Sequence, residues 1–166
     1  MSEITVANTD WSIVQAIKTA LGDAAIDSAA VFRSVTVAAS DAQSAECQFR
    51  DSPIAILRYV TTREDESPEG VRGCCVVLEL VLAAMVECAA TDESSRLQEV
   101  LRLKNAAINA VETDAPANSS AWGDGDHYHK RIQWGRPQID MTVRQPWAVC
   151  RLPLEVGYVL DNGTSH

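Results

Sequence analysis

The sequence predicts an α+β fold: a mainly antiparallel β-sheet of about four to five strands, with one long helix and an N-terminal helix packed on it. Apolar residues alternate with other residues over 147–160 and occupy both faces over 71–88, which are patterns typical of β-strands, and they recur at helical spacing over 93–111. Strand pairs interrupted by a single long helix favour an antiparallel sheet over a doubly wound parallel one.

The first part of the chain is expected to contribute a helix and a strand. Asp10 precedes apolar residues at helical spacing, so we predict a short amphipathic helix that Asp10 caps and Gly22 ends. β-branched residues favour a strand over 31–38, and residues 41–49 are interpreted as a brief helical turn.

The next segment predicts a hairpin that leads into the centre of the sheet. Residues 54–61 are strand-like, and the charged segment 62–70 is interpreted as an exposed connection with a solvated tip. Residues 71–88 are apolar on both faces, which predicts a central strand. One face of that strand is expected to carry Cys74, Val76, Leu78, Leu80 and Leu82, and the other Cys75, Val77, Glu79 and Val81.

A long helix is predicted from a cap at Thr91 or Asp92 to about Val111. Its apolar side is expected to hold Leu97, Val100, Leu101, Ala107, Ile108 and Val111, and its polar side Arg96, Glu99, Arg102 and Asn105. From Glu112 to Lys130 the residues are small, polar and turn-forming, which predicts a long loop of a kind that is often functional.

The C-terminal part predicts two further strand regions. Residues 132–143 are strand-like but are interrupted by Gly135 and Pro137, and residues 147–160 form the closing strand. Pro153 has no N–H to donate to a neighbouring strand, which favours an edge strand or a bulge there. An edge strand can be completed by a neighbouring subunit.

Size and composition predict one domain over residues 1–166, with 46% hydrophobic residues and a single core. The formal net charge of −9 argues against specific nucleic-acid binding. We expect neither an export signal nor a membrane span, because the longest apolar run, 74–86, contains Glu79 and is shorter than the roughly 20 residues of a membrane helix.

The five cysteines form an odd set without a repeated C-x-x-C, which favours small buried hydrophobes in a reducing cytoplasm. They are Cys47, Cys74, Cys75, Cys88 and Cys150. Adjacent Cys74 and Cys75 are expected to point to opposite faces of a strand, so they suit neither a mutual disulfide nor a shared metal.

No catalytic or cofactor-binding motif is present, so we nominate no catalytic, cofactor or metal residues. The one local group of metal-ligand types is Asp124, Asp126, His127 and His129. A small metal-dependent enzyme that uses this loop is the alternative hypothesis. The competing interpretation is a solvated or subunit-contact loop, because Asp and Gly are the usual residues of exposed turns.

Three tryptophans, Trp122, Trp134 and Trp147, flank the long loop and the last hairpin. Large aromatic side chains of this kind either anchor interfaces or fill the core, and the sequence leaves both interpretations open.

The order of these elements resembles that of phage tail terminator proteins. The resemblance rests on the central strand 71–88, the long helix 93–111, the hairpin with Pro and Trp, and the closing segment 147–158. The early helix that ends at Leu21 and the strand entry 52–57 are also similar to that family.

The resemblance implies a structural protein, not an enzyme, that assembles as a ring, commonly a hexamer. Such a ring caps the growing tail tube and helps to form the head–tail junction, so the implied partners are further copies, the tail tube protein and a head-completion protein. The implied location is the host cytoplasm during assembly and then the virion tail. Segments 62–70 and 115–130 are the expected tube-facing or neighbour-facing parts. A transient assembly adaptor or chaperone is a further alternative.

The acidic balance is compatible with a ring through which DNA passes, because a basic bore would retain phosphates and an acidic one would repel them. It is equally compatible with an ordinary acidic protein.

Overall fold

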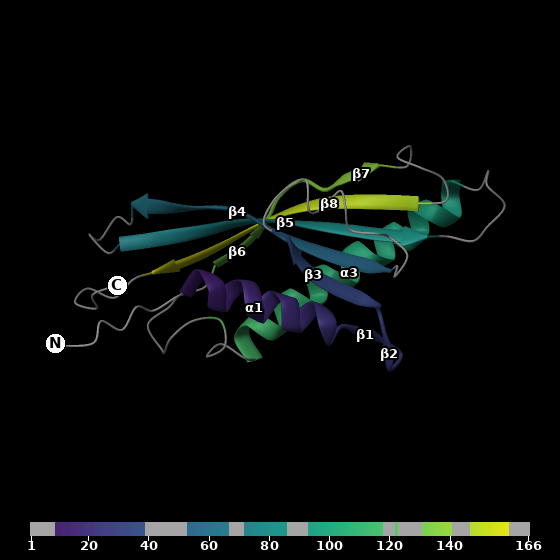
Figure 1. Cartoon of the computed structure of the whole chain (residues 1–166), viewed down its shortest axis with the longest axis horizontal. Helices are drawn as coiled ribbons and strands as arrows, with labels where there is room; N and C mark the ends of the chain where they lie inside the picture. The colour runs from purple at the N-terminus through teal and green to yellow at the C-terminus, as the bar shows by residue number, and fades with distance from the viewer. Residues whose placement is uncertain are drawn as a thin grey trace.

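The computed structural model describes residues 9–38, 53–66, 72–85, 93–117, 122, 131–140 and 147–159 (Figure 1). In chain order the described elements are α1 (Thr9–Gly22), β1 (Ala25–Ile26), β2 (Ala29–Ala30), β3 (Ser34–Ala38), β4 (Ile54–Glu66), β5 (Arg72–Met85), α3 (Glu93–Ala117), β6 (Arg131–Trp134), β7 (Gln138–Asp140) and β8 (Trp147–Val159). Strands β3 to β8 form one six-stranded sheet, and β1 and β2 form a separate two-stranded one.

The α+β prediction is confirmed, and so is the mainly antiparallel character of the sheet. The strand order is β3-β4-β5-β8-β6, with β7 also paired to β8. The sheet has six strands, more than expected, because the strand predicted over 132–143 divides into β6 and β7 around Gly135. It is also mixed, since β3 runs parallel to β4 while the other pairs are antiparallel.

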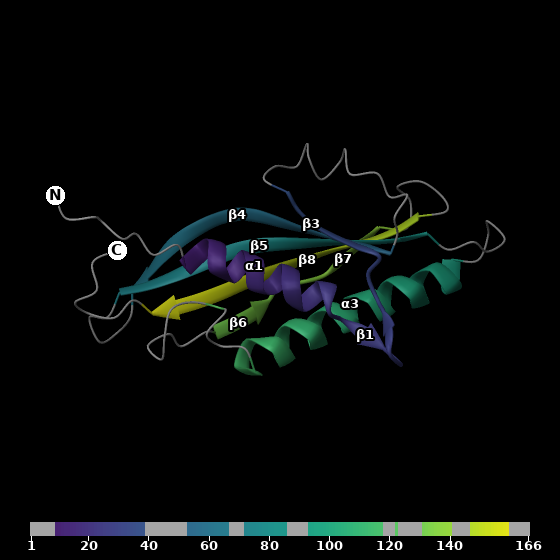
Figure 2. The same ribbon diagram turned by 60° about the horizontal axis from the view of Figure 1, so that its bottom comes forward.

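Both helices lie on the same face of the sheet (Figure 2). Helix α1 contacts β3 and β4, helix α3 contacts β5 and β8, and the two helices contact each other. The main core fills the space between this helix layer and the sheet. Its largest fully buried members include Ile13, Ile17 and Leu21 from α1, Leu103 from α3, and Leu78, Leu80, Leu82, Leu152 and Leu154 from the sheet.

Strand β5 is central, as predicted, because it pairs with β4 on one side and with β8 along its length on the other. The predicted separation of its faces is also confirmed: Val76, Leu78 and Leu80 belong to the core under the helices, whereas Val81 belongs to a second buried cluster. Alternation by single residues produces this separation, since successive side chains of a strand point to opposite faces.

Helix α1 confirms the first predicted helix but not its cap. The helix already includes Thr9, and Asp10 lies inside its first turn. The carboxylate of Asp10 bonds to side chains of β4 and β8. The predicted helical turn over 41–49 lies outside the described residues.

The strand predicted over 31–38 begins at Ser34, and Val31 and Phe32 are buried just before it. The small β1–β2 hairpin was not predicted from the sequence. Its two turn residues, Asp27 and Ser28, have φ values of 50° and 68°. Positive φ at both central residues is the requirement of a type I′ hairpin turn, which usually selects Asn or Gly. Asp-Ser is a weak signal for such a turn.

The prediction of a solvated loop from residue 62 was wrong for its first part, because β4 continues to Glu66 and pairs with β5 as far as Arg72. A bulge between Tyr59 and Thr61 shifts the register. Beyond the bulge, charged Arg63 faces away from the helices, where a strand tolerates charge at no desolvation cost.

Helix α3 begins at Glu93, directly after the predicted cap, but differs from its prediction at the C-terminal end. It continues beyond Val111 to Ala117, because Ala115 extends the buried stripe of Leu103, Ala107 and Val111 by another turn. The loop predicted from Glu112 therefore starts later.

The prediction of which residues are buried in the first turns of α3 was also wrong. Arg96 is 2% exposed and Leu97 is 41% exposed, the reverse of the expectation. The buried stripe includes Val100, and the residue four positions earlier on the same face is Arg96.

Pro153 does not mark an edge strand, because β8 pairs with β5 on one side and with β6 and β7 on the other. It lies at the gap where the neighbouring segment passes from β6 to β7. There the Gly135 N–H donates to the Pro153 carbonyl at 2.8 Å. The described edge strands are β3 on one side of the sheet and β6 with β7 on the other.

Candidate interaction surface

The sheet face turned away from α1 and α3, called here the outer face, has two parts. One part is an apolar cluster whose members are at most 5% exposed: Ala38, Ile54, Ile56, Val81, Ala83 and Val149. The other part, called here the outer polar zone, consists of Arg58, Arg63, Glu79, Arg131, Arg151 and Glu155. The register places each of these on the same face, because residues paired across a strand point the same way.

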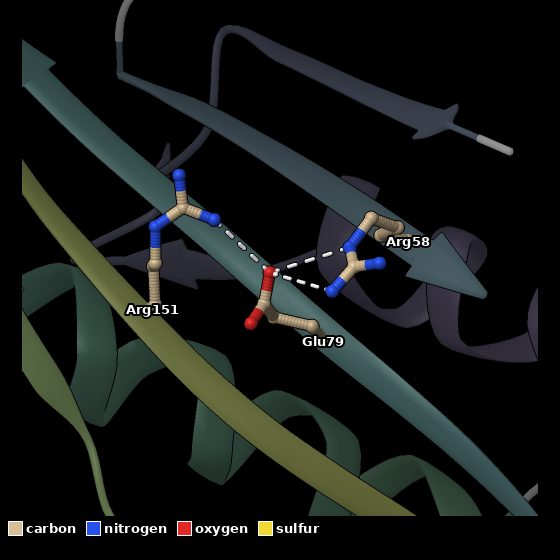
Figure 3. A network of polar contacts seen from close by, with 3 residues as sticks. All are labelled: Arg58, Glu79 and Arg151. Carbon is tan, nitrogen blue, oxygen red and sulfur yellow. Dashed lines mark hydrogen bonds and ion pairs between the residues drawn. The ribbon is translucent and has the colours of Figure 1, made fainter. Parts of the chain in front are cut away.

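The centre of the outer polar zone is Glu79, which receives two arginines from neighbouring strands (Figure 3). Arg58 Nε donates to Glu79 Oε1 at 3.3 Å, and Arg151 Nη1 donates to the same oxygen at 3.2 Å. The side chains of Arg58 and Glu79 are each 19% exposed. Because β5 lies between β4 and β8, its carboxylate is held from both sides.

A third ion pair crosses over β5. Arg63 on β4 donates to both carboxylate oxygens of Glu155 on β8, at 2.7 and 3.0 Å. This two-bond geometry is the most directional that an arginine and a carboxylate form. The three ion pairs together connect the three longest strands on the outer face.

The outer polar zone contrasts with the rest of the chain in charge. It carries four guanidinium groups and two carboxylates, on a chain whose formal net charge is −9. Arg63 and Arg151 have side chains that are 47% and 48% exposed, and Arg131 is exposed on β6. This zone can therefore offer arginine donors to a negatively charged partner.

The hydrogen bond from Arg63 lowers the pKa of Glu155 below its ordinary value of 4.5. A lowered pKa in the folded state means that the pair stabilises the fold above the ordinary pKa and loses this contribution as the pH falls through the lowered value.

We therefore expect Glu155→Gln to reduce the free energy of unfolding at pH 7 by less than about 1 kcal/mol, since the pair is partly exposed. The difference between wild type and variant should shrink as the pH falls below the ordinary glutamate pKa and disappear below the lowered pKa of Glu155. Urea unfolding at several pH values measures it. A difference that persisted unchanged at pH 2 would contradict the assignment.

At one end of the sheet, α1 is tied to two strands through Asp10. Tyr158 of β8 donates its hydroxyl to Asp10 Oδ1 at 2.6 Å, and Thr62 of β4 donates to Asp10 Oδ2 at 2.9 Å. Burial and the bond to Asp10 raise the pKa of Tyr158 above its ordinary value. The phenol therefore remains a donor at neutral pH.

Removing this hydroxyl in Tyr158→Phe should lower the free energy of unfolding by about 1 kcal/mol, the usual net value of one hydrogen bond. Thr62 should still hold Asp10, which limits the loss. Chemical denaturation of the two proteins measures the change. Tyr59→Phe is the matched control, because Tyr59 is 37% exposed and its hydroxyl bonds to Thr62 rather than to Asp10. Equal losses in the two variants would exclude a special role for the Asp10 contact.

Two shallow hollows lie on different parts of the molecule. One, of about 420 Å³, borders the outer polar zone and is lined by Gln133, Trp134, Gly135, Pro153 and Glu155. The other, of about 310 Å³, lies between α1 and α3, and its lining includes Asp23 and Asp114. Among the described residues that line them, neither hollow contains a histidine, cysteine or serine.

The structure places two of the three singled-out tryptophans. Trp122 is completely buried, and its Nε1 donates to Asp114 at 2.8 Å, so the core interpretation is correct for this residue. Trp134 is half-buried and donates from Nε1 to Glu112 on α3 at 2.9 Å. The side chain of Trp147 lies outside the described residues.

Asp124, Asp126, His127 and His129 also lie outside the described residues, so the hypothesis of a metal loop stays untested. In the part of the chain that the structure describes, no group of three or more His, Cys, Asp and Glu side chains is arranged to hold a metal ion.

Cys74, Cys75 and Cys150 are buried and carry thiols outside any disulfide, as the sequence predicted, and burial raises the pKa of Cys150. Cys47 and Cys88 lie outside the described part. A buried thiol with a raised pKa is a poor nucleophile.

The outer polar zone was not predicted from the sequence. A signal was present, since Glu79, Arg58 and Arg151 each interrupt an apolar strand, and a charge at such a position needs a partner. The identity of the partners depends on strand order, which the sequence pattern did not supply.

Comparison with known proteins brings no identification: no family model matches the chain, and no curated protein matches its sequence. Among the described residues, no helix is long and apolar enough to cross a membrane.

Proposed function

We propose that this chain is a structural assembly protein of a phage or prophage that caps the growing tail tube and helps to form the head–tail junction. Its further proposed partners are copies of itself in a ring, the tail tube protein and a head-completion protein. The proposal rests on the resemblance to tail terminator proteins and on the kind of surface that the fold presents. Its proposed location is the host cytoplasm during assembly and then the virion tail.

The observation that carries the proposal is the outer polar zone. It is a broad sheet surface, with side chains positioned by ion pairs across three long strands. Such a surface suits protein–protein contact, in which complementary charges set register and partner choice.

The end of the β4–β5 hairpin is a second supporting feature. Strand β4 continues to Glu66 and pairs with β5 up to that residue. The first part of segment 62–70, which was expected to be a tube-facing loop, therefore belongs to a pair of strands. In Figure 1 this hairpin end lies beyond the N-terminal end of α1. We propose that it contacts the tube or a neighbouring copy, together with the segment 115–130.

The test is tube capping. The purified protein is mixed with its cognate tail tube protein, and tube length and end decoration are measured by electron microscopy. We expect decorated ends and shorter tubes, and overlong tubes in a phage that lacks the gene. A chain that stays monomeric at high concentration and leaves tube ends undecorated excludes the proposal.

Mass spectrometry of purified virions separates a capping protein from a transient adaptor. A capping protein remains in the particle. Absence from virions, with assembly still dependent on the gene, indicates the adaptor instead and contradicts the proposal.

A further inference from the structure

We propose that the outer polar zone of one copy docks on the groove between α1 and α3 of a second copy, with arginines placed against carboxylates. This inference rests on the proposed ring assembly and deepens it, because it names the two surfaces that meet.

The sheet side supplies positive charge in a fixed orientation. Arg151 contacts Glu79 through Nη1, and Figure 3 shows its other terminal nitrogen pointing away from that carboxylate. A guanidinium has five N–H donors, so one contact leaves capacity for a second acceptor. Arg131 adds a further exposed cation on β6. The zone counts Arg58, Arg63, Arg131 and Arg151 against Glu79 and Glu155. With Asp140, which the β7–β8 register places on the same face, the described charges leave a surplus of one positive charge.

The helix side supplies a hollow with the opposite charge. The groove has a volume of about 310 Å³, and Asp23 and Asp114 contribute to its lining. No lysine or arginine occurs among the described residues that line it. Much of the remaining lining is alanine, for example Ala106 and Ala110. Small side chains leave room for a long side chain from another molecule to lie in the groove.

The groove side also has features that favour contact with protein. Ile26 is 38% exposed and contributes to the lining, which gives the groove an apolar margin. Asp114 accepts the Trp122 N–H, so its carboxylate is held in place, whereas Asp23 is exposed at the end of α1. The exposed turn residue Asp27 follows Ile26 and adds a further negative charge nearby.

The two surfaces lie on opposite sides of the molecule, one on the outer face and one in the helix layer. A contact between them is head-to-tail, and every copy offers both halves of it. Head-to-tail contacts generate a ring when the rotation between copies closes, and a filament when it does not. The proposed contact is therefore of the head-to-tail kind that a ring requires, and not the self-complementary kind of a twofold dimer.

The experiment exchanges the charges. Arg151→Glu places two acids against each other across the contact, and Asp23→Arg places two arginines against each other. Each variant alone should associate at least about ten-fold more weakly than wild type, equivalent to about 1.4 kcal/mol. An equimolar mixture of the two should recover the wild-type assembly, because each sheet zone then meets a groove of opposite charge. Sedimentation velocity in solution and decoration of cognate tube ends are the measurements.

Two controls support the interpretation. Lys18→Glu reverses an exposed charge of α1 outside the lining of the groove and should leave the ring intact. Circular dichroism shows whether each variant is folded. If Arg151→Glu unfolds because of the adjacent Glu79, Arg131→Glu on the edge strand replaces it in the same mixing experiment.

The outcomes separate this inference from the proposed function. A wild-type ring that neither variant weakens, or a mixture that fails to recover it, overturns the inference and leaves the ring proposal in place. Rings that stay intact while Arg151→Glu loses tube binding assign the outer polar zone to an acidic surface of the tube protein, and also overturn it. A wild type that forms no ring, in solution or on tube ends, overturns both.

Discussion

Replacing Trp122 by alanine should lower the free energy of unfolding by about 3–5 kcal/mol, the usual cost of removing a buried large aromatic side chain. Trp122 is 0% exposed and belongs to the main core, and its Nε1 donates to Asp114 of α3 at 2.8 Å. The variant loses apolar burial, leaves a cavity and removes a bond that holds the end of the helix. Domains have total stabilities of roughly 5–15 kcal/mol, so the loss is a large share.

Thermal and urea unfolding measure this effect, and two variants serve as controls. Trp122→Phe keeps most of the buried ring but loses the N–H, so its cost should be clearly smaller. Trp11→Ala removes a tryptophan that is 52% exposed and should also cost less. If Trp122→Ala and Trp11→Ala cost the same, the core position of Trp122 is refuted.

Gly135→Ala should lower the free energy of unfolding by about 1–3 kcal/mol, the usual cost of forcing an extra methyl into a packed site. A Cβ at this position lies 2.7 Å from Pro153 Cβ and 3.0 Å from Pro153 Cγ. The proline ring cannot rotate away, because it is part of the backbone of β8. The Gly135 N–H also donates to the Pro153 carbonyl at 2.8 Å, so the two strands are held close at this point.

The matched control is Gly22→Ala at the end of α1, where an added Cβ meets no atom within 4 Å. Alanine is a better helix former than glycine by up to about 1 kcal/mol, so this variant should be neutral or more stable. Urea unfolding of both variants should give shifts of opposite sign, or a shift in Gly135→Ala alone. A Gly135→Ala protein as stable as wild type would show that β6 and β8 do not approach closely at Pro153.

The long strands illustrate how much local pattern predicts. Alternation separated Leu80 from Glu79 and Leu152 from Arg151 onto opposite faces of their strands, and the structure agrees. Such predictions succeed because the side-chain period of a strand is a property of its backbone and does not depend on distant contacts.

Helix α3 and Pro153 illustrate where local pattern is insufficient. The helical period predicted an amphipathic helix, but its rotation about its own axis buried Arg96 and exposed Leu97. Contact with β5 and β8 sets that rotation. Pro153 was expected at an edge or a bulge, yet β8 is an inner strand. This inner strand tolerates the proline because the neighbouring segment interrupts its pairing opposite Pro153. Neither result follows from the neighbouring residues in the sequence.

The sequence by itself determined the type and order of the main helices and strands, and which side chains share a face of each long strand. These are consequences of backbone periods of 2 and 3.6 residues. Only the tertiary structure decided that both helices cover one face and that Arg58, Glu79 and Arg151 meet on the other. That meeting needs β4, β5 and β8 to be neighbours in a particular register, and strand pairing between distant segments is set by the packing of the whole core.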